Sequence, residues 1–150
     1  MRYELMTDDQ KEKMLERLHK KFNKLFYNNE LTLPHFIIAD YATSKESPGE
    51  EAWAGYLINC DIISFSRAID RDFSMCRTTI KQETIFLARI MLHEMAHQYC
   101  SMNGIDDSNH NENWHNVAKS HGLKFEEIYE EEMEMPSLTA IIAVRNFRLK

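Results

Sequence analysis

The run His93-Glu94-Met95-Ala96-His97 contains the side chains best suited to chemistry in this sequence. Residues four apart lie on the same face of a helix, so His93 and His97 could bind one metal ion. Glu94 lies one position around the helix, where its carboxylate could take a proton from a water molecule beside that ion. HExxH on a helix is typical of hydrolytic zinc sites, with the histidines as ligands and the glutamate as general base.

A catalytic zinc normally has three protein ligands and one open position, so a third ligand is needed. The downstream candidates are His110, Glu112, His115, His121 and Glu126. The spacing HExxHxxGxxH is excluded, because Cys100 and Asn103 stand at its Gly and final His positions. We favour His110, since the polar loop before it is long enough to turn back over the helix. Glu112 and Glu126 fit the spacing as alternatives, whereas His115 and His121 are expected to be bystanders.

The chemistry expected of such a site is hydrolysis of a peptide bond. The metal would lower the pKa of a water molecule and stabilise the oxyanion, and Glu94 would pass the proton to the leaving amine. Asp106, Asp107 and Glu112 are candidates for hydrogen bonds to the outer nitrogens of the ligands. Two alternatives remain: a non-catalytic, zinc-containing binding module, and an adaptor associated with DNA repair or replication.

The site requires a helix that positions the two histidines, and residues 78–102 are expected to form it. Apolar residues cover nearly every face of this segment, which predicts a buried helix. The other expected elements are a helix at 8–28, strands at 36–40, 53–58 and 61–66, helices at 111–121 and 125–134, and a strand at 138–144. The three early strands should form a small antiparallel sheet. These patterns predict the α+β class.

The sequence resembles the SprT-like zinc metallopeptidases, a family that includes a protease of DNA–protein crosslinks. The resemblance covers about residues 14–122 and is carried by LARIMLHEMAHQY (87–99), HNENW (110–114), AGYL (54–57) and IISFS (62–66). It implies a minimal zincin-like fold: an N-terminal helix, a small mostly antiparallel sheet, a buried HExxH helix and a following short helix. It also implies a zinc-dependent peptidase that acts on DNA-associated proteins.

Carried onto this chain, the family motif makes His93, His97 and His110 the zinc ligands and Glu94 the catalytic base. Trp114 matches an aromatic residue that packs below the site. Asn111 stands where the family has a glycine, and asparagine tolerates the left-handed backbone that such a turn would need. The zinc ribbon that often follows the family's core has no cysteines here to form it.

The composition predicts one domain with reduced thiols. A chain of 150 residues with a net charge of −6 does not favour nucleic-acid binding through bulk charge. Cys60, Cys76 and Cys100 are odd in number and scattered, which indicates free thiols. Residues 1–136 are interpreted as the metallopeptidase domain, and residues 137–150 as a strand and basic tail packed on it. No signal peptide or apolar span is found, so a cytoplasmic protein without membrane contact is expected.

A protein or peptide substrate is the expected partner, with a DNA contact through the first helix as a further hypothesis. That helix has six Lys and Arg from Lys11 to Lys24 against two Glu. Such a run of charges more often marks a solvent-exposed helix face. Basic and aromatic residues alternate there in one cluster: Lys20, Lys21, Phe22, Lys24 and Phe26.

Overall fold

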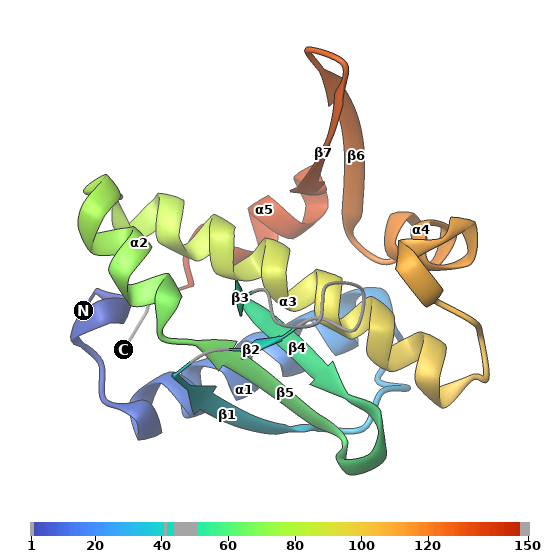
Figure 1. The fold of residues 1–150 in the computed structure, drawn as a ribbon, viewed down its shortest axis with the longest axis horizontal. Coiled ribbons are helices and arrows are strands. Elements are labelled where there is room, and N and C mark those ends of the chain that lie inside the picture. The colour runs from blue at the N-terminus through green and yellow to red at the C-terminus, as the bar shows by residue number, and fades with distance from the viewer. Residues whose placement is uncertain (1, 41, 44–50, 148–150) are drawn as a thin grey trace.

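A computed structural model describes residues 2–40, 42–43 and 51–147 and shows an α+β fold (Figure 1). The helices are η1 (Tyr3–Leu5), α1 (Asp8–Phe26), η2 (Ile58–Cys60), α2 (Ala68–Cys76), α3 (Ile80–Met102), η3 (Ser108–His110), α4 (Glu112–Ser120) and α5 (Leu138–Val144). The strands are β1 (His35–Ala39), β2 (Ala42–Thr43), β3 (Glu51–Ala52), β4 (Ala54–Leu57), β5 (Ile62–Ser66), β6 (Leu123–Ile128) and β7 (Glu131–Pro136).

The central sheet is mixed, with the strand order β1-β5-β4. Strand β4 runs antiparallel to β5, pairing Gly55 with Ser64, as the sequence predicted. Strand β1 instead runs parallel to β5, pairing Ile37 with Ser64, so the three early strands form a mixed sheet and not the antiparallel one that was expected of them. The parallel pair is possible because the chain between β1 and β5 is a long crossover that contains β4 rather than a tight turn.

Helix α3 is the centre of the fold and lies between the sheet and the C-terminal elements (Figure 1). It begins at a capping box, in which the Thr79 side chain accepts the Gln82 N–H and the Gln82 side chain accepts the Thr79 N–H. Twelve of its 23 residues are buried, among them Leu87, Met91 and Met95. The predicted buried helix is therefore confirmed, and its burial fixes the rotation of the HExxH face.

The C-terminal part of the chain corrects two predictions. Residues 125–134, expected as an acidic helix, lie in the antiparallel hairpin β6–β7, which projects from the molecule (Figure 1). The hairpin is anchored at its base, where Leu123 and Pro136 pair and are buried. A helix would also have placed Glu126, Glu130 and Glu134 on one face at spacings of four, where like charges repel.

Residues 138–144, expected as a strand, form helix α5. The Ser137 hydroxyl accepts the Ala140 N–H and so caps the helix at its start. Ala140 and Val144, four residues apart, are buried in the same hydrophobic core as α1 and α3. Helix α2, between β5 and α3, was not anticipated from the sequence.

Two simpler expectations concern thiols and membranes. Cys60, Cys76 and Cys100 are free, the first two exposed and the third buried. Across the described residues, no helix combines the length and apolar character needed to cross a membrane.

Candidate metal centre

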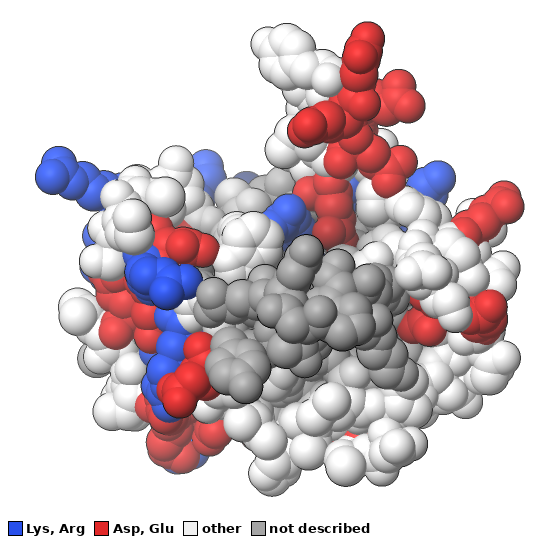
Figure 2. Space-filling model, viewed as in Figure 1, with Lys and Arg blue, Asp and Glu red and all other residues white. Residues whose placement is uncertain are grey.

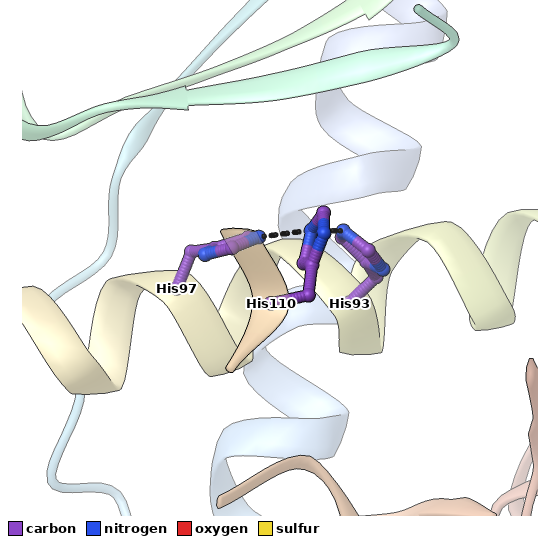
Figure 3. A group of neighbouring side chains, drawn as sticks. All are labelled: His93, His97 and His110. Atoms are coloured by element: carbon purple, nitrogen blue, oxygen red, sulfur yellow. Dashed lines mark hydrogen bonds between the residues drawn. The ribbon is translucent and has the colours of Figure 1, made fainter. Parts of the chain in front are cut away.

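Helix α3 and the loop that follows it bring three histidines together (Figure 3). His93 and His97 project from adjacent turns of α3, and His110 approaches them from η3. The Nε2 atom of His110 lies 3.0 Å from Nε2 of His97 and 3.0 Å from Nε2 of His93. In the described part of the chain, these three residues are the one group of His, Cys, Asp or Glu arranged to hold a metal ion. The sequence therefore predicted the members of this cluster.

A left-handed turn directs His110 towards the helix. Asn109 and His110 have φ angles of 54° and 49°, a region that few residues other than glycine adopt. Asn111, which the family resemblance led us to place in that region, is instead extended (φ −65°) and caps α4 by accepting the Trp114 N–H. The turn thus falls just before the position where the motif has glycine.

Hydrogen bonds to the backbone oxygen of Asp106 stabilise this turn. The side-chain amides of Asn111 and Asn113 donate to it over 2.9 and 3.2 Å. The Asp106 carboxylate accepts the N–H of Ser108 at 3.0 Å and also the Ser108 hydroxyl. Asp106 was a candidate to bond a ligand histidine, but in the structure it orders the loop that carries His110.

Two carboxylates fix the outer nitrogens of the helix histidines. Nδ1 of His97 lies 2.6 Å from Asp107 Oδ2, and Nδ1 of His93 lies 2.6 Å from Glu134 Oε1. Ionised carboxylates only accept hydrogen bonds, so each Nδ1 carries the proton, and the tautomers are inferred from that. Asp107 was among the sequence candidates. Glu134 was missed because its contact depends on a hairpin that the sequence did not predict.

The protons available on the three histidines do not satisfy both of the Nε2–Nε2 contacts. Burial and the nearby His93 lower the pKa of His97 to about 4, so its Nε2 is a bare acceptor at neutral pH. A single Nε2–H on His110 could donate to His97, but His110 would then have no lone pair or second proton for His93. Every protonation pattern therefore leaves one of the two 3.0 Å contacts unsatisfied, and a shared cation satisfies both.

The spacing also fits a metal of the zinc type. Two ligands at 2.0–2.1 Å in a tetrahedral site lie about 3.3 Å apart, close to the observed 3.0 Å. At His93, burial lowers the pKa, but the hydrogen bond to Glu134 and the charge of Glu94 outweigh it and raise the pKa above its usual value. These carboxylates would equally stabilise a cation held at Nε2. The residues present therefore fit a divalent metal.

Trp114 forms the floor of the site, as the resemblance implied. It is only 2% exposed, and its ring centroid lies 4.7, 5.4 and 4.6 Å from those of His93, His97 and His110. An aromatic surface of this size excludes water from beneath the cluster and limits the rotation of all three imidazoles. Glu94 is buried as well, at 5% exposed, on the same helix.

The remaining ligand candidates lie outside the cluster. Nε2 of His115 is 3.5 Å from Glu132, and His121 stacks on Tyr27 at 4.2 Å and donates from Nδ1 to the Val117 carbonyl. Glu126 pairs with Lys124, and Glu112 lies in the exposed first turn of α4. Both histidines lie outside the group formed by His93, His97 and His110.

The basic first helix does not present the alternating surface that its sequence suggested. Phe22 is fully buried, and Phe26 packs against the core. Lys11 is buried and paired with Asp70, and Lys20 pairs with Glu16. The aromatic members of the cluster therefore belong to the interior, which removes the stacking partners that single-stranded nucleic acids use.

No family model, curated protein or solved structure matches this chain.

Proposed function

We propose that this protein is a zinc-dependent peptidase with His93, His97 and His110 as ligands and Glu94 as general base. The observation that carries the proposal is the convergence of three Nε2 atoms, two of them on histidines whose opposite nitrogens are held by carboxylates. A set of three imidazoles suits zinc, and three protein ligands would leave a fourth position open, as in catalytic zinc sites.

Each residue around the cluster would have a distinct role in peptide hydrolysis. Bound zinc supplies a Lewis acid that acidifies water and polarises the substrate carbonyl. Glu94 accepts the proton of the attacking water and delivers it to the leaving amine nitrogen. Asp107 and Glu134 hold the Nδ1–H groups, so that both helix histidines keep the correct tautomer and orientation. Trp114 keeps water away from the inner side of the imidazoles.

The resemblance to SprT-like metallopeptidases supports the same proposal. The elements it would require are present: a helix before the sheet, a sheet with an antiparallel β4–β5 pair, a buried HExxH helix and a short following helix. We therefore assign the chain a minimal zincin-like fold, with a protein or peptide as substrate. DNA-associated proteins are the substrate class that the resemblance favours.

The rival of a purely structural zinc site fits less well. Structural zinc usually has four protein ligands, whereas the group in the described residues contains three. A structural site would also have no use for Glu94, a carboxylate that is buried next to a ligand and costs free energy to desolvate.

The decisive test replaces Glu94 by its uncharged isostere. Glu94→Gln should retain one zinc per chain, measured by atomic absorption, and should lower peptide cleavage by about 10²–10⁴-fold, the usual contribution of a general base. Glu112→Gln, on the exposed face of α4, is the matched control and should cleave normally. Cleavage by Glu94→Gln at the wild-type rate would refute the mechanism.

A further inference from the structure

We infer that Arg89, held on an aromatic platform formed by Trp53 and Phe86, recognises a carboxylate of the polypeptide substrate. The inference rests on the proposed peptidase function and adds a substrate preference to it. Arg89 precedes His93 by four residues on α3, so it lies on the same face, about 6 Å along the helix axis. It therefore belongs to the surface over which a substrate would approach the three histidines.

The platform orients the guanidinium group of Arg89. Its Cζ lies 5.1 Å from the ring centroid of Phe86 and 5.7 Å from that of Trp53. These two rings meet edge to face at 5.2 Å, and the indole N–H of Trp53 donates to Asp72 over 2.8 Å. A guanidinium whose carbon lies over aromatic rings can keep N–H donors free for a planar, bidentate acceptor such as a carboxylate.

These donors have no acceptor in the part of the chain that the structure describes. Arg67, by contrast, pairs with both Asp8 and Asp40, and Arg2 pairs with Glu4 and Glu83. The chain carries 24 Asp and Glu against 18 Lys and Arg. Arg89 is half-buried, so the hydration that its guanidinium loses would be recovered when a ligand carboxylate binds.

The position of Arg89 suits a side chain or terminus of a peptide. An extended chain advances about 3.3 Å per residue, so 6 Å along α3 corresponds to about two residues from the bond that is cleaved. A polyanion such as DNA is less suitable. The hairpin β6–β7, whose base reaches His93 through Glu134, carries six Glu on its strands and turn, and these would repel a polyanion beside the cluster (Figure 2).

The test uses zinc-loaded full-length protein and a set of internally quenched peptides. The peptides differ by a single Glu-for-Gln exchange, moved from three residues before the cleaved bond to three after it. A second set compares a free with an amidated C-terminus at the same positions, which separates a side-chain carboxylate from a terminal one. The Glu94→Gln protein is titrated with the same peptides by calorimetry, so that binding is measured without turnover.

At one position, about two residues from the cleaved bond, we expect the Glu peptide to have at least a tenfold higher kcat/KM than the corresponding Gln peptide. Arg89→Met should reduce that ratio to about one, and Arg89→Lys should reduce it partially because a lysine cannot form the bidentate contact. The matched control is Arg17→Met, since Arg17 also stacks on a ring, that of Phe147 at 4.9 Å, but lies on α1. This control should keep the wild-type ratio.

Three results would overturn the inference: a wild-type ratio near one at all positions, the same ratio in Arg89→Met as in Arg17→Met, or an Arg89→Met defect confined to binding of single-stranded DNA. Failure of the proposed function would look different. The wild-type protein would then cleave none of the peptides, while calorimetry would still report whether Arg89 distinguishes Glu from Gln.

Discussion

Two segments hold the helix histidines, and they do so in different ways. The loop after α3 supplies Asp107 to His97 across ten residues of sequence, and hydrogen bonds to Asp106 stabilise it internally. The hairpin β6–β7 supplies Glu134 to His93 across 41 residues and projects from the molecule (Figure 1). Both contacts are 2.6 Å long, so the same donor–acceptor distance is reached from an internally hydrogen-bonded loop and from a projecting hairpin.

The difference between the loop and the hairpin indicates which changes should affect the three-histidine cluster most. The loop carries the proposed ligand His110 as well as the carboxylate of Asp107, so any loop rearrangement affects both. The hairpin carries no ligand and reaches the site only near its base, where Phe125 pairs with Glu134 and packs against Trp114 at 5.8 Å. We expect loss of His110 from the loop to weaken metal binding most, and changes to the carboxylates of the loop and the hairpin to weaken it less.

Removal of the loop's ligand should have the largest effect. His110→Ala should weaken zinc affinity by more than about 100-fold, the upper end of the cost of an outer hydrogen bond, because a direct ligand is lost. Competition with a chromophoric chelator measures this. His115→Ala and Glu126→Ala, which change a histidine and a carboxylate outside the cluster, should bind zinc normally. Equal losses in His115→Ala and His110→Ala would show that the loop adopts another arrangement around the metal.

Removal of the two carboxylates compares the segments directly. Asp107→Asn and Glu134→Gln should each weaken zinc affinity by about 10–100-fold, because an amide no longer fixes the Nδ1–H tautomer as strongly. We expect the larger loss from Asp107→Asn, since Asp107 lies in the same loop as His110, whereas the hairpin contributes no histidine to the cluster. Glu132→Gln is the control for the hairpin, because its carboxylate faces His115 rather than a ligand. An unchanged affinity in Glu134→Gln would mean that the hairpin does not hold His93 in solution.

The same contrast explains how much could be predicted from the sequence. The cluster of His93, His97 and His110 followed from a spacing of four on a helix and from the length of one loop, both local properties. Asp107 was within reach of that reasoning because it lies in the same loop. Glu134 was not, since its role depends on the fold of residues 123–136.

The hairpin was misinterpreted because its composition favours a helix. Phe125, Ile128 and Tyr129 have helical spacing, and glutamate is a good helix former. Tertiary contacts override this preference: Phe125 and Glu134 are cross-strand partners and both face the site, where they meet Trp114 and His93. Short apolar runs are ambiguous in the same way, and only the Ser137 cap could have identified α5 as a helix.

Substitutions in the turn of the hairpin should have the smallest effect on zinc affinity. They test whether local opening of the hairpin weakens the contact between Glu134 and His93. Tyr129 and Glu130 connect the paired residues Ile128 and Glu131 with φ angles of 53° and 65°. Both positions of such a two-residue turn favour Asn-Gly, and an ordinary residue in left-handed backbone costs about 1–2 kcal/mol. Tyr129→Asn with Glu130→Gly should therefore stabilise the hairpin by about 1–2 kcal/mol, measured by hydrogen exchange of the β6–β7 amides.

The matched change in the loop is Asn109→Gly, at a φ of 54°. Asparagine already tolerates this conformation, so we expect a gain of less than about 0.5 kcal/mol there. If the hairpin opens locally in solution, the stabilised turn should also raise zinc affinity slightly, and this gain should vanish in the Glu134→Gln background. A gain that persists without Glu134 would show that the hairpin acts on the metal centre through Phe125 and Trp114 rather than through the contact to His93.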